Sequence, residues 1–268
     1  MKKAKLTAHM IVKNEEYWIW YAIHSVLPLI DAMLIFDTGS TDKTPEIISA
    51  FPQGKVVFEK KGPQKREGLV SLRNEMVKRT KTDWFILVDG DEIWPRSGLK
   101  AVVKNIQNSS DDTWGLVVRT RNCVGDVWHY QPESAGRYEL LGRKGHLSIR
   151  VYRKLPGFTW QGEYPNEAYC DDLGNPINDQ DEHLRFVDVA YWHVTHLPRS
   201  SRSQQVIDRT KKRKLERGIK AKRIELPEVF FAQRPVIVPS PWMRPTILQQ
   251  SGAAILTPLR RVKRRLFR

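Results

Sequence analysis

The segment Asp89-Gly90-Asp91-Glu92 carries the clearest chemical signal in this sequence. It follows five consecutive apolar residues, 84–88, which predict a strand buried on both faces. Open α/β sheets bind ligands along the carboxyl edge of their strands, so the two aspartates should face a ligand there. Two carboxylates separated by one small residue can hold a hard divalent cation through oxygen. Asp-Gly also favours ordinary surface turns, so the surrounding segments must decide between the two interpretations.

Polar side chains follow two other expected strands in the same way. Asn14 and Glu15 come after residues 6–12, and Asp37 comes after residues 32–36. The carboxyl ends of parallel strands meet at one sheet edge, so we expect these side chains to border the same crevice. Each could instead serve only as a cap, for a helix in the first case and for the turn after Asp37 in the second.

The elements needed to position these residues follow from a regular alternation over the first 112 residues. Expected strands lie at 6–12, 32–36, 55–59 and 84–88, and expected helices at 15–27, from 44 onward, 67–79 and 97–107. Thr44 is the expected N-cap of the second helix, with Pro45 in its first turn. Such alternation predicts a parallel sheet with helices covering both faces.

The character of the chain changes after residue 113. Expected strands at 114–124, 146–153 and 186–193 are separated by loops, 125–145 and 155–182, rather than by helices. Beyond them the sequence predicts a basic helix over 200–218, an extended proline-rich strap over 226–245 and a short helix from 257. Long loops at such positions are often functional or mobile.

The positive charge is confined to the end of the chain. The net charge is +15, yet residues 1–198 are neutral, while 199–223 carry +9 and 258–268 carry +6. The body is therefore no electrostatic nucleic-acid binder, and we expect no specific nucleic acid as a partner. The mean hydropathy of −0.50, two cysteines without a metal or disulfide spacing and a start unlike a signal peptide suggest a cytoplasmic protein.

Four segments in order resemble family 2 glycosyltransferases, inverting enzymes with a GT-A fold. They are Met10-Ile11-Val12-Lys13-Asn14-Glu15-Glu16, Asp37-Thr38-Gly39-Ser40-Thr41-Asp42-Lys43-Thr44, Arg73-Asn74 and Asp89-Gly90-Asp91-Glu92. A fifth, residues 150–167, looks like a later segment of that family. Most relatives have alanine where this chain has Gly90, and histidine where it has Asn166.

The resemblance implies a nucleotide-sugar donor, UDP-linked, and a divalent cation, Mn²⁺ or Mg²⁺. Asp91 would be the direct metal ligand, and Asp89 would contact the ribose or reach the metal through water. His193, with His196 as the alternative, would complete the metal site; either histidine could instead be structural. The donor-binding residues implied are Val12, Asn14, Glu15, Asp37, Arg73, Asp89 and Gly90. Arg73 could otherwise be a solvated helix arginine.

An inverting transfer requires one general base to deprotonate the acceptor hydroxyl. Glu167 is the candidate, because the family keeps an acid after a segment like Trp160-Gln161-Gly162. Asp126 and Glu163 are rivals, and a structural salt bridge would equally explain Glu167.

Together these features predict an α/β protein with a GT-A (Rossmann-like) α/β/α sandwich around a mainly parallel sheet. The expected domain covers residues 1–198, with a donor-binding half over about 1–112 and an acceptor half over about 113–198, and a basic extension over 199–268. The predicted function is sugar transfer to a glycan or lipid-linked acceptor. The alternatives are a nucleotidyltransferase, which would need a basic glycine-rich loop where this chain has Lys13-Asn14-Glu15-Glu16, and a polyanion binder acting through the basic end.

The last twelve residues predict a membrane-binding element. Thr257 is the expected N-cap and Pro258 the first helical residue, after which Leu259, Val262 and Leu266 form one apolar stripe among basic residues. An anionic bilayer would stabilise such a helix and place the protein peripherally on the cytoplasmic face. A disordered or self-docked basic tail is the alternative.

Overall fold

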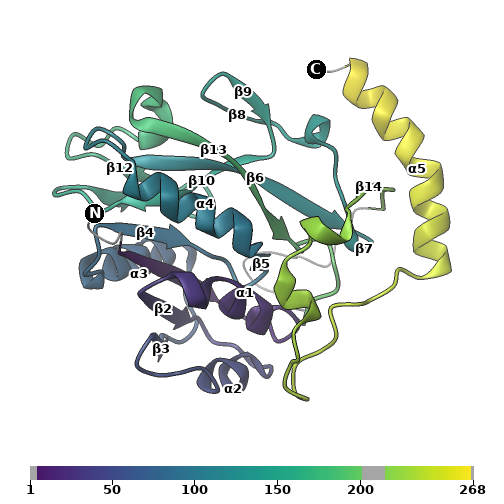
Figure 1. Ribbon diagram of the computed structural model, residues 1–268, viewed down its shortest axis with the longest axis horizontal. Coiled ribbons are helices and arrows are strands. Elements are labelled where there is room, and N and C mark those ends of the chain that lie inside the picture. Colours follow the sequence, from purple (N-terminus) through teal and green to yellow (C-terminus); the bar gives the residue numbers. More distant parts are fainter. Residues whose placement is uncertain (1–4, 201–214, 267–268) are drawn as a thin grey trace.

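A mixed β-sheet runs through the centre of the protein, which is described here by a computed structural model (Figure 1). The structure describes residues 5–200 and 215–266. Within them the sheet has ten strands, in the order β14-β7-β6-β10-β4-β1-β2-β3, with β13 pairing to β5 and β6. The expected α/β architecture is confirmed.

The first half of the sheet is parallel, as predicted. It consists of β1 (Leu6–Val12), β2 (Ala32–Asp37), β3 (Val56–Lys60) and β4 (Trp84–Leu87). Val12 pairs with Asp37 at the end of β1 and β2, and β4 continues into Val88, whose N–H donates to the carbonyl of His9 at 3.0 Å. The segments that follow these strands therefore emerge at one edge of the sheet.

Helices cover both faces of this half. The helices are α1 (Ile19–Val26), α2 (Thr44–Ser49), α3 (Arg66–Arg79) and α4 (Arg96–Gln107). Residues of α1, α2 and α4 share one hydrophobic cluster with Met33 and Ile35, whereas Leu72 and Met76 of α3 pack on Leu34 and Phe36. Because side chains alternate along β2, these two clusters lie on opposite faces of the sheet.

Two of the expected helix starts are wrong. Residues 16–18 form a turn before α1, and Thr44 is the first residue of α2 rather than its N-cap. The Thr44 hydroxyl instead accepts a 2.7 Å hydrogen bond from the N–H of Glu15, while Asp42 Oδ1 accepts from the N–H of Thr44 at 2.9 Å. A contact between distant loops has taken the side chain that a local cap would have used.

The second half of the sheet is largely antiparallel. Its strands are β5 (Glu92–Ile93), β6 (Gly115–Val124), β7 (Asp126–Tyr130), β10 (Leu147–Arg153), β13 (Leu184–His193) and β14 (Ile219–Lys220). The segments 125–145 and 155–182, predicted as loops, contain β7 and two small hairpins as well. These hairpins are β8 (Tyr138–Leu140) with β9 (Arg143–Gly145), and β11 (Thr159–Gln161) with β12 (Ala168–Cys170).

Short 3₁₀ turns connect several of these elements. They lie at Leu27–Leu29, Glu133–Ala135, Ile177–Asp179, Asp181–His183, Arg223–Glu225 and Glu228–Phe231. The last of them falls within the segment 226–245, predicted as an extended strap. Five apolar residues of 221–238 belong to the main hydrophobic cluster, so this part of the extension packs against the domain.

The chain ends in α5 (Ile247–Leu266), a 20-residue helix that stands along one side of the molecule (Figure 1). The prediction of a short helix capped by Thr257 is wrong, because Thr257 and Pro258 lie in the interior of α5. The predicted basic helix over 200–218 falls largely on residues 201–214, outside the described residues, and 215–218 are not helical. None of the helices in 5–200 and 215–266 has the length and apolar character needed to cross a bilayer.

Candidate functional site

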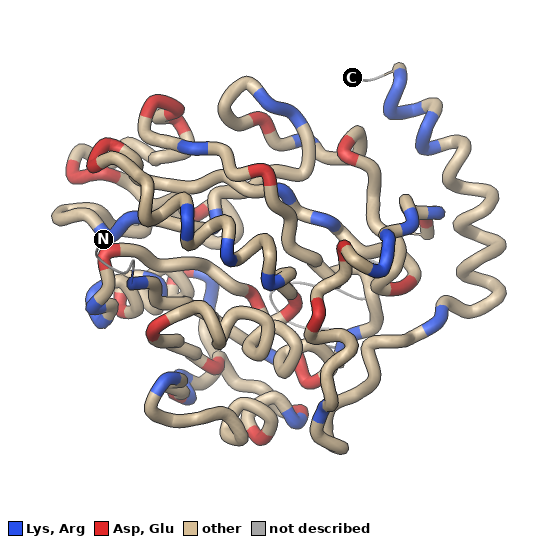
Figure 2. Tube along the Cα trace, viewed as in Figure 1, with Lys and Arg blue, Asp and Glu red and all other residues tan. Residues whose placement is uncertain are grey.

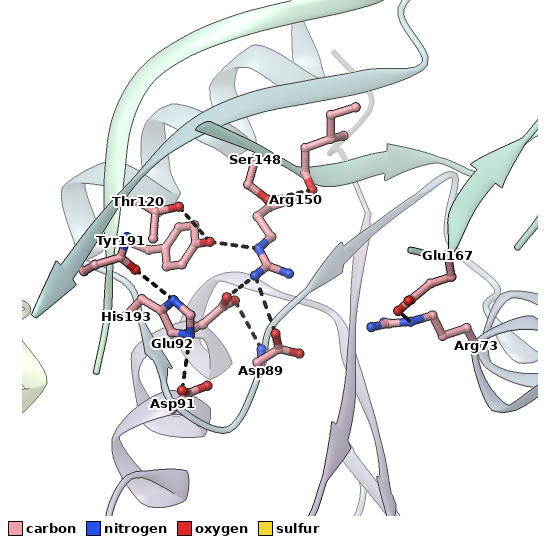
Figure 3. Close-up of polar contacts among 12 residues, drawn as sticks. Arg73, Asp89, Asp91, Glu92, Thr120, Ser148, Arg150, Glu167, Tyr191 and His193 are labelled. Atoms are coloured by element: carbon pink, nitrogen blue, oxygen red, sulfur yellow. Dashed lines mark hydrogen bonds and ion pairs between the residues drawn. The ribbon is translucent and has the colours of Figure 1, made fainter. Parts of the chain in front are cut away.

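The turn between β4 and β5 brings the predicted acids together with the end of β13 (Figure 3). The N–H of Glu92 donates to the carbonyl of Asp89 at 3.0 Å, and the N–H of Asp89 donates to Glu92 Oε2 at 3.2 Å. Glu92 is paired with His193 across the β5–β13 ladder. Asp89 and Glu92 are therefore joined by two hydrogen bonds across the turn, and strand pairing fixes the position of the turn relative to β13.

Asp91 and His193, both predicted metal ligands, contact each other. Asp91 is 4% exposed, and its Oδ2 lies 3.2 Å from His193 Nε2. The other ring nitrogen of His193 lies 3.1 Å from Oδ1 of Asn122, on β6. Burial opposes a charge on the imidazole, but the attraction and hydrogen bond of Asp91 outweigh it and raise the pKa of His193 above its usual value.

Arg199 is a functional candidate that the sequence did not reveal. Its guanidinium forms ion pairs with both Asp91 and Glu15, and all three side chains are almost fully buried. A cation is thus held between two carboxylates from different strand ends. The family resemblance ended near residue 197, before Arg199. The one sequence signal for this position is a basic residue that closely follows His193 and His196.

A second buried arginine supports the turn from the opposite direction. Arg150, on β10, pairs with Glu92 and lies 3.5 Å from Asp89 Oδ2, while its Nε donates to the Tyr191 hydroxyl at 3.0 Å. Burial raises the pKa of Glu92 to about 7, although Arg150 opposes this. The carboxyl of Glu92 therefore serves to hold the turn, and Asp89, whose side chain is 40% exposed, is the acid that remains open to a ligand.

The loops after β1 and β2 are tied to each other. Asn14 has a positive φ of 54°, and its Oδ1 accepts from the N–H of Thr41 at 2.7 Å. Asp37 accepts from the N–H of Ser40 at 3.1 Å and from its hydroxyl at 2.5 Å, and the Val12 carbonyl accepts from Thr38 at 2.9 Å. Asp37 thus has the turn-capping role considered for it, whereas Asn14 joins two loops and caps no helix. The roles of both residues in donor binding stay predictions.

Gly90 is required by close packing. A Cβ at this position would lie 2.9 Å from Cγ of Glu15 and 3.2 Å from Cγ2 of Val12. Glu15 is held in place by Arg199, so it has little freedom to move aside. The glycine that departs from the usual family pattern is therefore explained by the neighbouring loop.

Arg73 and Glu167, predicted as donor contact and base, form an ion pair with each other. Arg73 Nε lies 3.0 Å from Glu167 Oε1, and both side chains are mostly buried. Figure 3 shows this pair at a distance from Asp89 and Asp91. The salt bridge considered as the alternative for Glu167 is present. Next to it, Asn74 exchanges two 2.8 Å hydrogen bonds with the backbone of Trp160, which fixes β11 to α3.

The two rival bases lie in different surroundings. Asp126 Oδ1 accepts from the N–H of Trp128 at 2.8 Å and lies 2.7 Å from His129 Nδ1. Asp126 and His196 both line a cavity of about 540 Å³ bordered by the C-terminal segment. Glu163 is exposed in the loop after β11.

Asp91 and His193 are the residues at the turn that could hold a cation together with the oxygens of a ligand, although Asp91 Oδ2 is also paired with Arg199. Within the described chain, no three or more His, Cys, Asp or Glu side chains are grouped so that they could hold a metal alone. Asp91, in the turn after β4, and His193, at the end of β13, come together, and one or two carboxylates are what a Mg²⁺ site uses when phosphate oxygens supply other ligands. His196, the alternative, lines the cavity instead.

A scan against known families finds that residues 7–165 match the model of glycosyl transferase family 2. The curated relatives include the SPbeta prophage-derived glycosyltransferase SunS of Bacillus subtilis (strain 168) and glycosyltransferase SunS of Bacillus phage SPbeta. Each is 25% identical over 100 residues, which is 37% of this chain and 23% of the relative. The match thus spans about a quarter of the length of these relatives.

Solved structures with a similar chain course include two bacterial proteins. S. aureus TarS residues 1–349 is 16% identical, with a TM-score of 0.47, over 71% of this chain and 60% of that one. Glucosyl-3-phosphoglycerate synthase from Mycobacterium tuberculosis, in complex with Mn²⁺, UDP and glucosyl-3-phosphoglycerate, is 21% identical, with a TM-score of 0.44, over 71% of this chain and 72% of that one.

Proposed function

Because the chain belongs to glycosyl transferase family 2 and has a GT-A-like α/β fold, we propose that it is a metal-dependent, inverting glycosyltransferase. The donor is a nucleotide sugar, UDP-linked, and the acceptor a glycan or a lipid-linked sugar. One observation carries this proposal: Asp91 and His193, far apart in the sequence, converge at the carboxyl edge of the sheet, next to the partly exposed Asp89.

Asp91 and His193 would hold the divalent cation, with Asp89 beside it. When bound, such a cation neutralises the charge that develops on a departing diphosphate. Asn122 fixes the orientation of the His193 ring, which is the usual task of a hydrogen-bond partner behind a metal ligand.

Arg199 is placed to act on the same diphosphate. Its guanidinium pairs with Asp91 and with Glu15, and Glu15 lies in a loop that carries proposed donor contacts. Bidentate donors of this kind suit phosphate oxygens. Asp37 and Asn14 would bind the nucleoside, and Gly90 allows Glu15 and Val12 to pack directly against the turn.

Glu167 is the proposed general base, held in one orientation by Arg73. Asp126 is the second candidate, because it lines the cavity next to His196 and is oriented by two hydrogen bonds. A base must reach the acceptor hydroxyl within hydrogen-bonding distance, so the two assignments place the acceptor on different sides of the turn.

Calorimetry with UDP in the presence and absence of Mn²⁺ tests the donor site. We expect Mn²⁺-dependent binding that weakens at least about tenfold in Asp91→Asn and in His193→Ala, as for the loss of a metal ligand or its support. Asp111→Asn, a fully exposed acid, is the matched control and should bind as the natural chain does. Equal UDP affinity in EDTA and in Mn²⁺ would contradict the metal assignment.

A further inference from the structure

Helix α5 is attached to the protein by its small and polar face. The Thr257 hydroxyl accepts from the N–H of Arg217 at 2.8 Å, and Thr257 and Ala253 are its two buried residues. Arg264 forms a two-pronged ion pair with Glu216, with distances of 2.5 and 2.9 Å, and Arg260 approaches the same carboxylate at 3.7 Å. The inward face is thus Ala253, Thr257, Arg260 and Arg264.

The large apolar side chains of α5 lie on the opposite face. Ile255, Leu259, Val262 and Leu266 each come two residues after a member of the inward face. Two residues correspond to about 200° of rotation around a helix axis, so the two rows point in opposite directions. With Leu248, this outward row is between 56% and 84% exposed. An amphipathic helix normally turns such a row toward the core, and here it faces away from it.

The charges of α5 identify what the outward row contacts. The helix contains no acidic residue, and Arg261, Lys263 and Arg265 are exposed beside the row, on its last turns. Figure 2 shows these basic residues gathered at the C-terminal end of the helix. Glu216 neutralises only the inward arginines. An apolar row flanked by free cations matches an anionic lipid surface, where an interfacial helix lies flat with its apolar side chains in the acyl boundary.

We propose that the outward face of α5, formed by Leu248, Ile255, Leu259, Val262 and Leu266, binds the surface of a membrane that contains anionic lipid. The inference extends the proposed function, since a lipid-linked acceptor would be presented at that surface. It differs from the expectation for the last twelve residues, because the binding element is the whole helix and is already docked on the protein.

Vesicle sedimentation with the full chain tests the proposal. We expect binding to mixed phosphatidylcholine–phosphatidylglycerol vesicles, weaker binding at high salt, and little binding to phosphatidylcholine alone. The double variant Leu259→Gln/Leu266→Gln should lower the affinity at least about tenfold, and Arg261→Glu/Lys263→Glu should do the same. These side chains are exposed, so thermal unfolding should be nearly unchanged.

The matched control removes exposed apolar residues elsewhere. Leu173 and Val236 are 83% and 105% exposed and lie outside α5, so Leu173→Gln/Val236→Gln should leave vesicle binding within about twofold. Equal loss in the control, or equal binding to both kinds of vesicle, would overturn the proposal.

A second copy of the chain is the competing occupant. Concentration-dependent dimerisation that the Leu259→Gln/Leu266→Gln variant abolishes, without vesicle binding, would assign the row to self-association and overturn the proposal. UDP affinity in solution is measured separately and should be the same in this variant and the natural chain. If the natural chain binds UDP but not vesicles, only the membrane inference is overturned. If it binds vesicles but not UDP, only the proposed function is overturned.

Discussion

The carboxyl edge of the sheet and helix α5 both contain side chains in surroundings that are unfavourable for them, but of opposite kinds. At the sheet edge, charged side chains are buried and held in pairs, Arg199 with Asp91 and Glu15, and Arg150 with Glu92. On α5, large apolar side chains are exposed. Buried charges are costly to desolvate, and exposed apolar patches mark contact surfaces. The comparison matches the two proposals, in which the sheet edge binds an anionic ligand and α5 binds a membrane surface.

A large effect is expected at Glu167, the proposed base. Glu167→Gln should lower the transfer rate by about 10²–10⁴-fold with UDP affinity retained, because it removes the proton acceptor and keeps the hydrogen bond to Arg73. Asp126→Asn and Glu163→Gln are measured alongside it. If Asp126→Asn shows the loss and Glu167→Gln only weakens UDP binding, the ion pair with Arg73 is structural and the acceptor lies at the cavity.

The parallel half of the sheet should contribute to the pH dependence of the free energy of unfolding. His9 is fully buried, stacks on Phe85 and has its pKa lowered to about 3, chiefly by burial. The folded protein keeps it neutral while the unfolded chain protonates it, so its contribution is complete above about pH 6.5 and is lost as the pH falls toward 3. By pH 5 the loss is about 2 kcal/mol.

Urea unfolding at about pH 7 and about pH 5 measures this contribution. The natural chain should lose about 2 kcal/mol more stability between the two conditions than His9→Gln does, because the variant has no imidazole to protonate. Equal losses in both proteins would show that other groups dominate the acid sensitivity of this half.

Close packing at the turn predicts an effect of similar size or smaller. Gly90→Ala should lower the free energy of unfolding by about 1–3 kcal/mol, because the new methyl group meets Glu15, which Arg199 holds in place. Gly54→Ala is the control, since no atom lies within 4 Å of a Cβ there. If Gly90→Ala leaves the free energy of unfolding unchanged, the loop after β1 can move aside and Arg199 does not hold Glu15 in place.

On α5 the smallest effect is expected. Thr257→Val removes the hydroxyl that accepts from Arg217 and should cost about 1 kcal/mol. Since α5 is attached by few contacts, the loss should appear as faster proteolysis of α5 rather than as a lower unfolding temperature of the domain. A drop in global stability equal to that of Gly90→Ala would show that α5 belongs to the cooperative unit of the domain.

The parallel half was predictable because its signals are local. Apolar runs such as Trp84–Leu87, each followed by polar residues and a helix, determine strand positions and the edge where Asp89 and Asp91 emerge. The contact of His193 with Asp91 was anticipated only through the family resemblance. Arg199 could not be found, because its pairing with Asp91 and Glu15 depends on how β13 returns to β5.

The end of the chain shows why local signals also mislead. Thr257-Pro258 is a typical helix start, yet the helix continues through both residues. The longer helix is stabilised by contacts of Thr257 with Arg217, 40 residues away, and of Arg264 with Glu216, 48 residues away. Such long-range contacts override a cap signal that the sequence alone favours.

The most direct test of the central claim is UDP release from a panel of UDP-sugars, with and without Mn²⁺, by the natural chain, Asp91→Asn and the exposed-acid control Asp111→Asn. The account predicts that the natural chain and the control release UDP only with the cation. Asp91→Asn should release UDP at least about 10³-fold more slowly, because the cation that stabilises the leaving diphosphate loses its proposed carboxylate ligand. Full release by Asp91→Asn, or by the natural chain in EDTA, would contradict it.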